Sequence, residues 1–470
     1  MPAGPASAPS PATDKKRRPG LLGRLGPGLI TGAADDDPSG IATYSQAGAQ
    51  FRFGLAWTLL LTTPLMIAVQ LVSARIGYVT RQGLAAGMCR LLPRRAALVI
   101  VAALVVANTI NIAADISAMA EATRLLTGGP SWPWVLAWGG ASAALQIYAS
   151  YERTVRVLKW LTLTLFAYVA VVLVIEVPWR RALEESAAPW RALPPGSAKA
   201  YAAMVVAMLG TTISPYLFFW QATQEAEEHR RAAKAPTPHP GGPAAERHGG
   251  HDKTDKRGGH DKHDKDDKQD PQDRHGKMAG RLAAIRQDTV LGMLLSNAVA
   301  LCIVFSAAVA LNLAGHTDIR SAADAAAALQ PVAGEFAFAL FALGIVGTGA
   351  LAIPVLAGSA AYAVSEVFGW RAGLSRRFQD ARGFYSIILA ATLLGTAMSL
   401  VQVDAMAALV TSAVINGVIA VPVMAVMLLI GRSRRLLGEF VIGPWLAALG
   451  WAATAVMAAA SLAMFATMFG

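Results

Sequence analysis

The sequence predicts an all-α membrane protein built from two five-helix halves and an eleventh helix. Three observations predict it: charge is scarce, long apolar stretches recur along the chain, and two of these stretches are interrupted at matching places. Only 15% of the 470 residues are Asp, Glu, Lys or Arg, whereas soluble domains carry about 25%. A chain of this composition lacks the polar surface to cover itself in water, which excludes a soluble protein.

Ten stretches of 16 or more residues hold almost no charged side chain, and an eleventh is apolar apart from three consecutive carboxylates. A helix of about 20 apolar residues crosses a bilayer, and open sheet edges are not tolerated there. Eleven spanning helices are therefore expected, in halves at 25–180 and 200–428 followed by a last helix at 440–468. The segments are 25–51, 53–74, 96–114, 125–151, 160–175, 200–224, 288–319, 336–365, 383–403, 405–431 and 440–470.

The basic residues predict the orientation of these helices. With the N-terminus inside, 34 of the 41 Lys and Arg residues fall on inner connections and seven on outer ones, as the positive-inside rule requires. We expect a multi-pass protein of a bacterial inner membrane with a disordered, basic cytoplasmic tail at 1–24. The net charge of +11 then reflects the excess of Lys and Arg on the inner connections. Nucleic acid is not an expected partner, because no aromatic residues interleave the basic stretches as a base-stacking surface requires.

The charge that remains is concentrated between 229 and 280. This stretch holds 12 Lys or Arg, 9 Asp or Glu and seven of the eight His. It has almost no large apolar side chains, so we expect a disordered cytoplasmic loop. Its His and Asp residues could bind metal loosely, either as a sensor or incidentally. The carboxylates that precede it form either an acidic exit mouth or an ordinary helix end meeting water: Glu225, Glu227 and Glu228.

The first apolar segment is interrupted at its centre by Asp35, Asp36 and Asp37, followed by Pro38. Proline removes a backbone donor and disfavours helix at the preceding residue. A helix broken inside a bilayer leaves backbone groups that need a cavity, a partner or an ion. We therefore predict a cation site at Asp37. Asp35 and Asp36 either belong to the ion pathway or line a wet vestibule.

The sixth segment is interrupted in the same way at 210–216, which reads Gly-Thr-Thr-Ile-Ser-Pro-Tyr. Alone, this run would be explained by an ordinary proline kink. Five helices precede it, however, so the two broken segments are the first helices of two halves. Paired interruptions at corresponding positions indicate an inverted-repeat transporter with its binding site at the membrane midplane. The eleventh helix then lies outside the repeats.

The residues around both breaks resemble those of the natural-resistance-associated macrophage protein (Nramp) metal transporters. The likeness covers most of the chain outside 229–280. It implies the LeuT-type fold of two inverted five-helix repeats, a divalent metal held between helices one and six, and alternating access, often with proton cotransport. It is carried by Gly26-Pro27-Gly28, Asp37-Pro38-Ser39-Gly40, Ala42-Thr43, Ala47-Gly48-Ala49-Gln50, Ser73-Ala74-Arg75, Gly77, Val79-Thr80 and the run 210–216.

The sequence departs from the family at several implied metal ligands. Asp37 falls on the ligating Asp of the family's Asp-Pro-Gly-Asn motif, but Gly40 falls on the ligating Asn, so that side-chain oxygen is missing. The family's Met-Pro-His is Ser214-Pro215-Tyr216 here, while Thr211 falls on the position whose backbone carbonyl ligates metal. Oxygen-only sites suit Mg²⁺, Ca²⁺ or Mn²⁺ better than softer ions. In lacking the Met, the sequence is similar to the Nramp-related magnesium transporters.

Further polar residues are candidates for the ion pathway. The family has carboxylates at the positions of Asp115 and Ala118, and Glu121 does not simply replace the missing one. Tyr216 in place of His removes a group that titrates near neutral pH, which favours uncoupled or weakly coupled transport. Asp115 is either part of a proton or water network or a satisfied interior Asp. Asn416 either faces the cavity or bonds a neighbouring helix.

The sequence thus predicts a secondary transporter of divalent cations, with Mg²⁺ or Mn²⁺ favoured, working as a monomer in the lipid bilayer. Asp37 would be the principal charged ligand, and Thr211 and Ser214 would supply oxygens. One alternative is a proton-coupled Mn²⁺/Fe²⁺ importer, and another is a metal-responsive membrane regulator acting through the His-rich loop. No nucleophile–base pair or cofactor motif occurs in the sequence, so we expect neither an enzyme nor a bound cofactor.

Overall fold

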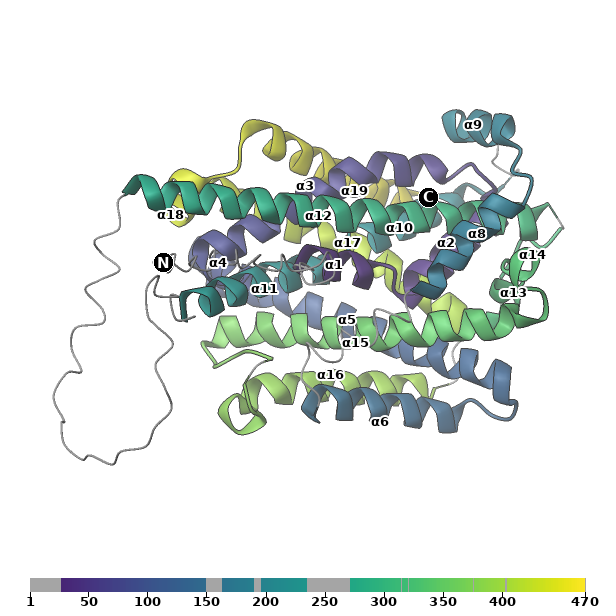
Figure 1. Ribbon diagram of the computed structural model, residues 1–470, viewed down its shortest axis with the longest axis horizontal. Coiled ribbons are helices and arrows are strands. Elements are labelled where there is room, and N and C mark those ends of the chain that lie inside the picture. The colour runs from purple at the N-terminus through teal and green to yellow at the C-terminus, as the bar shows by residue number, and fades with distance from the viewer. Residues whose placement is uncertain are drawn as a thin grey trace, which may run out of the picture.

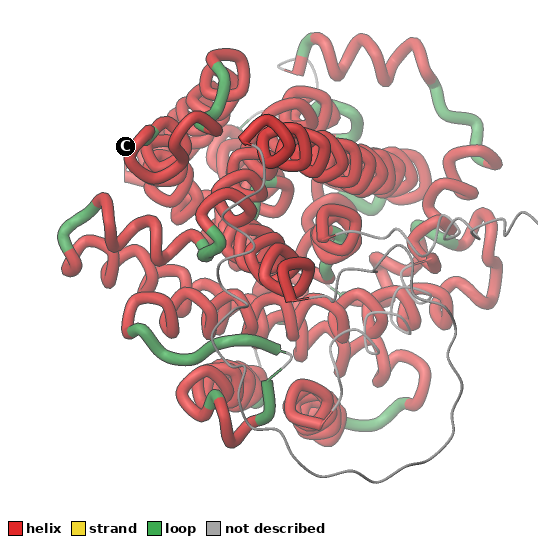
Figure 2. The backbone as a smooth tube through the Cα atoms, turned by 60° about the vertical axis from the view of Figure 1, so that its left-hand side comes forward, coloured by secondary structure: helices red, strands yellow, loops and turns green. Residues whose placement is uncertain are grey.

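The computed structural model describes most of the chain, and the regular structure within the described ranges is helical (Figure 2). The predicted tail at 1–24, the start of the predicted segment 160–175 and the central part of the predicted loop 229–280 lie outside these ranges. The described residues are 27–148, 163–189, 196–234, 271–313, 315–319, 321–374, 376–401 and 404–469.

The helices of the first predicted half include one that is broken near the middle of its length. Each of its predicted apolar segments falls on helix. In order, the elements are α1 (Pro27–Asp35), α2 (Pro38–Phe51), α3 (Ala56–Thr80), α4 (Leu84–Leu91), α5 (Arg94–Thr127), α6 (Trp132–Tyr148), the short 3₁₀ turn η2 (Leu163–Leu165), α8 (Phe166–Val174) and α9 (Trp179–Ala187).

The second half repeats this plan, starting again with a broken helix, and a last helix follows it. Its elements are α10 (Ala198–Thr212), α11 (Pro215–Lys234), α12 (Pro271–Ala307), the π-helical turn η5 (Ala308–Asn312), α13 (Ala322–Ala327), α14 (Gln330–Ala333), η6 (Gly334–Phe336), α15 (Ala337–Phe368), η7 (Phe378–Asp380), α16 (Arg382–Ser399), α17 (Ala405–Arg432), α18 (Arg434–Leu437), η8 (Gly438–Phe440) and α19 (Pro444–Phe469).

Seven helical stretches in the described part of the chain are long and apolar enough to cross a membrane. The other predicted segments coincide with helices that are interrupted or shorter, so the count of eleven stays a prediction. The seven stretches are Ala56–Thr80, Arg94–Thr127, Ala198–Arg230, Met278–Asn312, Gln330–Phe368, Ala405–Arg432 and Pro444–Met468.

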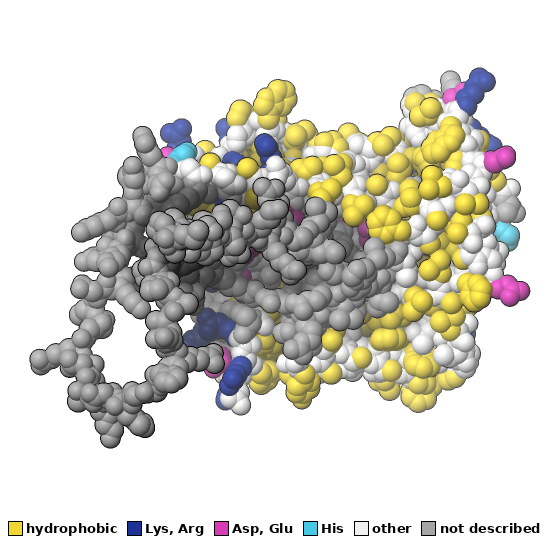
Figure 3. All heavy atoms as spheres, viewed as in Figure 1, with side chains coloured by type: hydrophobic (Ala, Val, Ile, Leu, Met, Phe, Trp, Pro, Cys, Tyr) yellow, Lys and Arg dark blue, Asp and Glu magenta, His cyan; other side chains and the backbone are white. Residues whose placement is uncertain are grey.

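The short connecting helices gather at two opposite ends of the molecule. α4 and α18, which lie on predicted inner connections, are at one end, whereas α9, α13 and α14, on predicted outer connections, are at the other (Figure 1). Hydrophobic side chains spread over the sides between these ends, while the visible charged side chains stand mostly toward the ends (Figure 3). This distribution suits a protein that crosses a bilayer along its long axis.

Polar side chains bind neighbouring helices together inside the apolar core. Asn108 of α5 donates to the carbonyl of Leu356 on α15 at 2.9 Å, and Ser73 of α3 donates to the carbonyl of Phe218 on α11 at 2.5 Å. Such bonds stabilise helix pairs in membrane proteins, where apolar burial alone does not drive helices together. They hold α3, α5, α11 and α15 around the two breaks.

Both ends of the predicted loop 229–280 are helical. α11 continues to Lys234, and α12 already begins at Pro271, so the expectation of an unfolded segment was too wide at each side. Proline at the first position of a helix costs no hydrogen bond, because that N–H has no helical partner. The average composition of 229–280 is very polar and did not indicate that a helix begins at Pro271.

Candidate metal-binding site

The two helix breaks are built in the same way. α1 ends at Asp35 and α2 begins at Pro38; α10 ends at Thr212 and α11 begins at Pro215. In each case a proline opens the second half-helix, where its missing N–H is harmless and its fixed φ suits the first turn. Asp37 is the N-cap of α2 with extended backbone (φ −74°, ψ 171°). The local sequence thus places an acidic side chain at the exposed amides of a half-helix.

The carboxylate of Asp37 lies where the two broken helices meet α5. Its Oδ1 accepts hydrogen bonds from the Ser39 hydroxyl at 2.6 Å and the Gly40 amide at 2.8 Å. Its Oδ2 accepts from the Asn111 amide of α5 at 3.2 Å. The Tyr216 hydroxyl of α11 also reaches this oxygen at 3.2 Å, and its one hydrogen is shared with the Ala34 carbonyl at 3.1 Å. The side chain is 2% exposed. Donors from three helices therefore orient one buried carboxylate.

Gly40 and Thr211 meet across the two breaks. A Cβ added to Gly40 would stand 3.2 Å from the Thr211 hydroxyl oxygen, closer than an ordinary contact. That hydroxyl is buried and has no hydrogen-bond partner in the described part of the chain. Without a side chain at position 40, an oxygen of α10 comes close to the segment that carries Asp37.

The Ser214 hydroxyl lies against the broken end of its own helix. It is 2.9 Å from the carbonyl oxygens of both Gly210 and Thr211, either of which can accept its one hydrogen. The Thr211 carbonyl expected at the metal keeps a second lone pair when it accepts this hydrogen. The structure therefore brings Asp37, Gly40 and Thr211 together, while the Ser214 hydroxyl satisfies its own helix.

Asn111 is a residue of this cluster that the sequence prediction missed. It joins Asp37 to α17, because the Ser412 hydroxyl donates to its Oδ1 at 2.7 Å. Its spacing to Asp115 was the available signal, since residues four apart lie on the same face of a helix. Asp115 itself is fully buried, and neither carboxylate oxygen has a hydrogen-bond partner among the described residues.

Asn416 and Asp36 are also buried near the breaks. Asn416, on α17, is 1% exposed, and no described residue bonds its Oδ1. Asp36 is 6% exposed and accepts from the hydroxyl of Ser296 on α12 at 3.1 Å. Asp36 therefore contacts α12 through Ser296.

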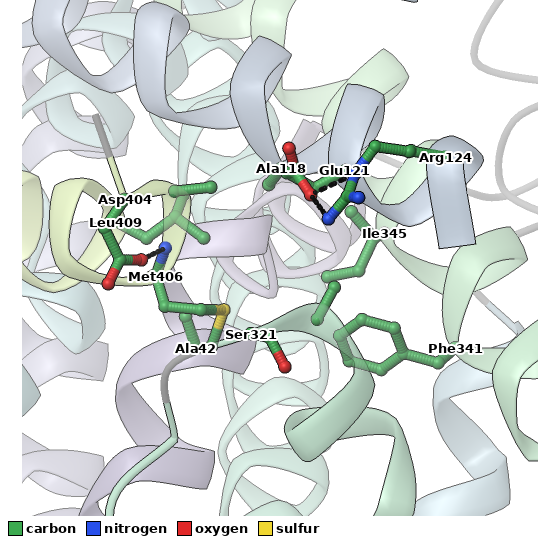
Figure 4. A pocket seen from close by; sticks show the side chains of 12 residues that line it. Ala42, Ala118, Glu121, Arg124, Ser321, Phe341, Ile345, Asp404, Met406 and Leu409 are labelled. Atoms are coloured by element: carbon green, nitrogen blue, oxygen red, sulfur yellow. Dashed lines mark hydrogen bonds and ion pairs between the residues drawn. The ribbon is translucent and has the colours of Figure 1, made fainter. Parts of the chain in front are cut away.

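Glu121 lies away from these residues, at the predicted outer end of α5. It forms an ion pair with Arg124 at 2.7 Å, and both side chains line a cavity of about 290 Å³ (Figure 4). Asp404, at the start of α17, stands on the opposite wall. The cavity also reaches Ala42 on α2, which is slightly more than one turn beyond Pro38. It therefore leads from the predicted outer end toward the break in the first helix.

The donor atoms at the breaks are oxygens. Within the described ranges no three His, Cys, Asp or Glu side chains converge as a metal site, so an ion here would need hydroxyl, carbonyl and water oxygens besides Asp37. Such ligands suit hard cations, and Mg²⁺ in particular keeps several waters and uses few carboxylates.

Comparison with known proteins places this architecture in a family. The family model described as "Natural resistance-associated macrophage protein-like" matches residues 28–467. The chain is 23% identical over 350 residues to the "Divalent metal cation transporter MntH" of Pectobacterium carotovorum, covering 73% of this chain and 72% of that one. It is 26% identical over 351 residues to the protein of the same name from Yersinia pestis, covering 72% of each.

A solved structure has the same fold. The manganese transporter of Eremococcus coleocola aligns with a TM-score of 0.68 at 16% identity, covering 96% of this chain and 88% of that one. The fold is LeuT-like, as predicted, and the family match makes the chain a multi-pass membrane transporter and not an enzyme. The chain belongs to the Nramp family.

Proposed function

We propose that the protein carries divalent metal cations across the membrane by alternating access, with Mg²⁺ or Mn²⁺ as the favoured ion. The main support is the position of Asp37, a buried carboxylate at the junction of two broken helices and α5. Charge buried in a membrane protein usually marks an ion pathway. The relatives named as divalent metal cation transporters support the same conclusion.

The preference for a hard ion rests on the oxygen donors around the breaks. Ser214 and Tyr216 stand where the family has a thioether and an imidazole, so only oxygen ligands remain with Asp37 and Thr211. The transport cycle would move the two halves, 25–180 and 200–428, against each other about this site, as in other inverted-repeat transporters. The chain needs no cofactor for this cycle, only the transported ion and the bilayer.

A proton-coupled Mn²⁺/Fe²⁺ importer is the second candidate, and one observation favours it. Asp115 is a buried carboxylate whose oxygens have no hydrogen-bond partner among the described residues, and a carboxyl group in that setting can exchange a proton. Against strict coupling stands Tyr216, a phenol within hydrogen-bond distance of Asp37, where an imidazole would titrate near neutral pH. We therefore propose transport without strict proton coupling.

Ion flux into proteoliposomes that contain a Mg²⁺-sensitive or Mn²⁺-sensitive dye tests the proposal. The wild-type protein is expected to carry Mg²⁺ without acidifying the lumen, and Asp37→Ala to abolish the flux. Asp380→Ala, which removes an exposed carboxylate in η7, is the matched control and retains flux. Mn²⁺ uptake with acidification and no Mg²⁺ flux would establish the importer instead.

Deletion of 236–270 separates transport from a role in metal sensing. This deletion keeps α11 and α12 as the structure bounds them. If the protein is a transporter, the deletion variant still carries the ion. A protein that binds divalent ions through the loop but carries none would be a metal-responsive membrane regulator.

A further inference from the structure

Asp35 and Asp36, the two carboxylates before Asp37, share one hydroxyl. Ser296 of α12 lies 2.8 Å from Asp35 Oδ2 and 3.1 Å from Asp36 Oδ1. A serine hydroxyl has a single hydrogen and can donate it to only one acceptor at a time. Three oxygens, one each from Asp35, Asp36 and Ser296, therefore converge at the end of α1. The Ser296 hydrogen can lie between only one of the two close oxygen pairs, so the other pair has no hydrogen from Ser296 between its atoms.

More oxygen atoms without partners surround this group. The second oxygen of Asp35 has no hydrogen-bond partner among the described residues, although Asp35 is 1% exposed. The hydroxyl of Tyr44, also 1% exposed, has no partner among these residues either. α1 also ends here, and the last carbonyls of a helix carry partial negative charge. The local field favours a cation.

No positive side chain balances this charge within the part of the chain that is described. Asp35, Asp36, Asp37 and Asp115 are each at most 6% exposed, and none of them forms an ion pair with Lys, Arg or His. Taking a charge out of water without a partner costs several kcal/mol. One divalent ion at Asp37 can neutralise at most two carboxylates, so any further carboxylate of the four that stays ionised needs a second positive charge.

We propose that Asp35, Asp36 and Ser296 bind a second divalent cation, at the end of α1 next to the Asp37 site. Two carboxylates and a hydroxyl are the ligands of a hard ion such as Mg²⁺ or Mn²⁺, with water completing the shell. The second ion would neutralise the carboxylates that the first leaves uncompensated. The second site depends on the proposed function in one respect: it assumes that the transported ion binds at Asp37.

The number of bound ions tests the proposal on the full-length protein in detergent. Equilibrium dialysis against Mg²⁺, followed by elemental analysis, is expected to show that the double variant Asp35→Asn/Asp36→Asn binds one ion fewer than the wild-type protein. Ions held elsewhere, for example by the His- and Asp-rich stretch 236–270, count equally in both samples and cancel. Adding Asp37→Asn to the double variant removes one further ion.

Ser296→Ala refines the test, because it keeps both carboxylates and removes the shared hydroxyl. We expect the affinity for the second ion to fall about tenfold, as for the loss of one supporting group at a metal. Ser306→Ala is the matched control: Ser306 is a buried serine on the same helix, and its hydroxyl donates to the Tyr168 carbonyl. This variant is expected to bind as many ions as the wild-type protein.

Loading with Mn²⁺ gives an independent readout of proximity. Two Mn²⁺ ions in adjacent sites broaden each other's paramagnetic resonance, and the spectrum of Asp35→Asn/Asp36→Asn is expected to return to that of an isolated ion. An unchanged ion count together with an unchanged spectrum would show that protons neutralise Asp35 and Asp36 and would overturn the proposal. If the double variant does not fold, the same comparison is made with Ser296→Ala and Asp36→Asn.

The proposed function can fail separately from the second site. If Asp37→Ala still transports Mg²⁺ while Asp35→Asn/Asp36→Asn loses one bound ion, then Asp37 is not the transport site but the second ion exists. If Asp37→Ala abolishes transport and the double variant keeps every ion, the proposed function stands and the second site is refuted.

Discussion

Asp37 is oriented by donors from several helices. Besides Ser39 and Gly40 on its own half-helix, Asn111 of α5 and Tyr216 of α11 lie within hydrogen-bond distance of its Oδ2 and fix the direction in which the carboxylate faces an incoming ion. Asn111 is itself fixed by Ser412 of α17. Binding at Asp37 is therefore coupled to α5, α11 and α17, which is how an ion could change the packing of the surrounding helices.

Asn111→Ala should weaken ion binding without unfolding the protein. Loss of one oriented hydrogen bond to a carboxylate costs about 1.5 kcal/mol, so the KM for Mg²⁺ flux is expected to rise about tenfold, with kcat nearly unchanged. Asn108→Ala, three residues earlier on α5, is the control, because Asn108 bonds only α15 among the described residues. It should lower the melting temperature and leave KM unchanged; the opposite pattern would exclude a positioning role for Asn111.

Ser214→Met should change ion preference. The substitution introduces a thioether at the second break and releases the carbonyls of Gly210 and Thr211 from the serine hydroxyl. Soft ligands favour softer ions, so the ratio of Cd²⁺ to Mg²⁺ uptake is expected to rise about tenfold. Thr223→Val, which removes a similar hydroxyl bonded within α11, should leave the ratio unchanged. If Ser214→Met and Thr223→Val show the same ratio of Cd²⁺ to Mg²⁺ uptake, ligand softness at position 214 does not determine ion preference.

At the scale of elements, α1 is fastened to α12 by backbone contact. The Gly28 amide at the start of α1 donates to Asp288 of α12 at 2.7 Å. At Gly32, a Cβ would stand 2.5 Å from the carbonyl oxygen of Gly292, so only glycine permits this approach. This contact therefore holds α1, the predicted inner half of the broken helix, against α12.

Gly32→Ala should separate α1 from α12. Because the new methyl group meets backbone that cannot move cheaply, the cost is about 1–3 kcal/mol, seen as a lower melting temperature by calorimetry. Gly140→Ala is the control: it lies exposed on α6 with no atom within 4 Å of the added Cβ, and alanine favours helix there. A Gly32→Ala variant as stable as the control would show that the contact is not tight in solution.

The breaks could be predicted from sequence because proline acts locally. Asp37-Pro38 and Ser214-Pro215 end and restart helices through a missing N–H, and the structure confirms both positions. Contacts between distant segments could not be read in this way: Ser296 meets Asp35 and Asp36 only because α12 packs on α1. The bonds of Ser214 to its own helix were also missed, since a hydroxyl beside a break can turn either inward or toward a ligand.

At the scale of the whole molecule, orientation in the membrane follows from the distribution of Lys and Arg. The structure places the predicted inner connections at one end and the predicted outer ones at the other (Figure 1). That agreement supports the predicted order in which the helices cross the membrane. Which end faces the cytoplasm is predicted from the Lys and Arg residues alone. The cavity lined by Glu121 and Asp404 lies at the predicted outer end, so sidedness also decides which compartment this cavity adjoins.

Cysteine labelling in intact cells tests the sidedness. In a Cys89→Ser/Cys302→Ser background, Leu183→Cys on α9 and Phe378→Cys on η7 introduce exposed thiols at opposite ends (71% and 40% exposed before substitution). A membrane-impermeant maleimide is expected to label the cysteine at 183 in intact cells and the cysteine at 378 only after permeabilisation, because the connection that carries 378 is rich in Arg. The reverse pattern would place the N-terminus outside and turn the cavity at Glu121 into a cytoplasmic entrance.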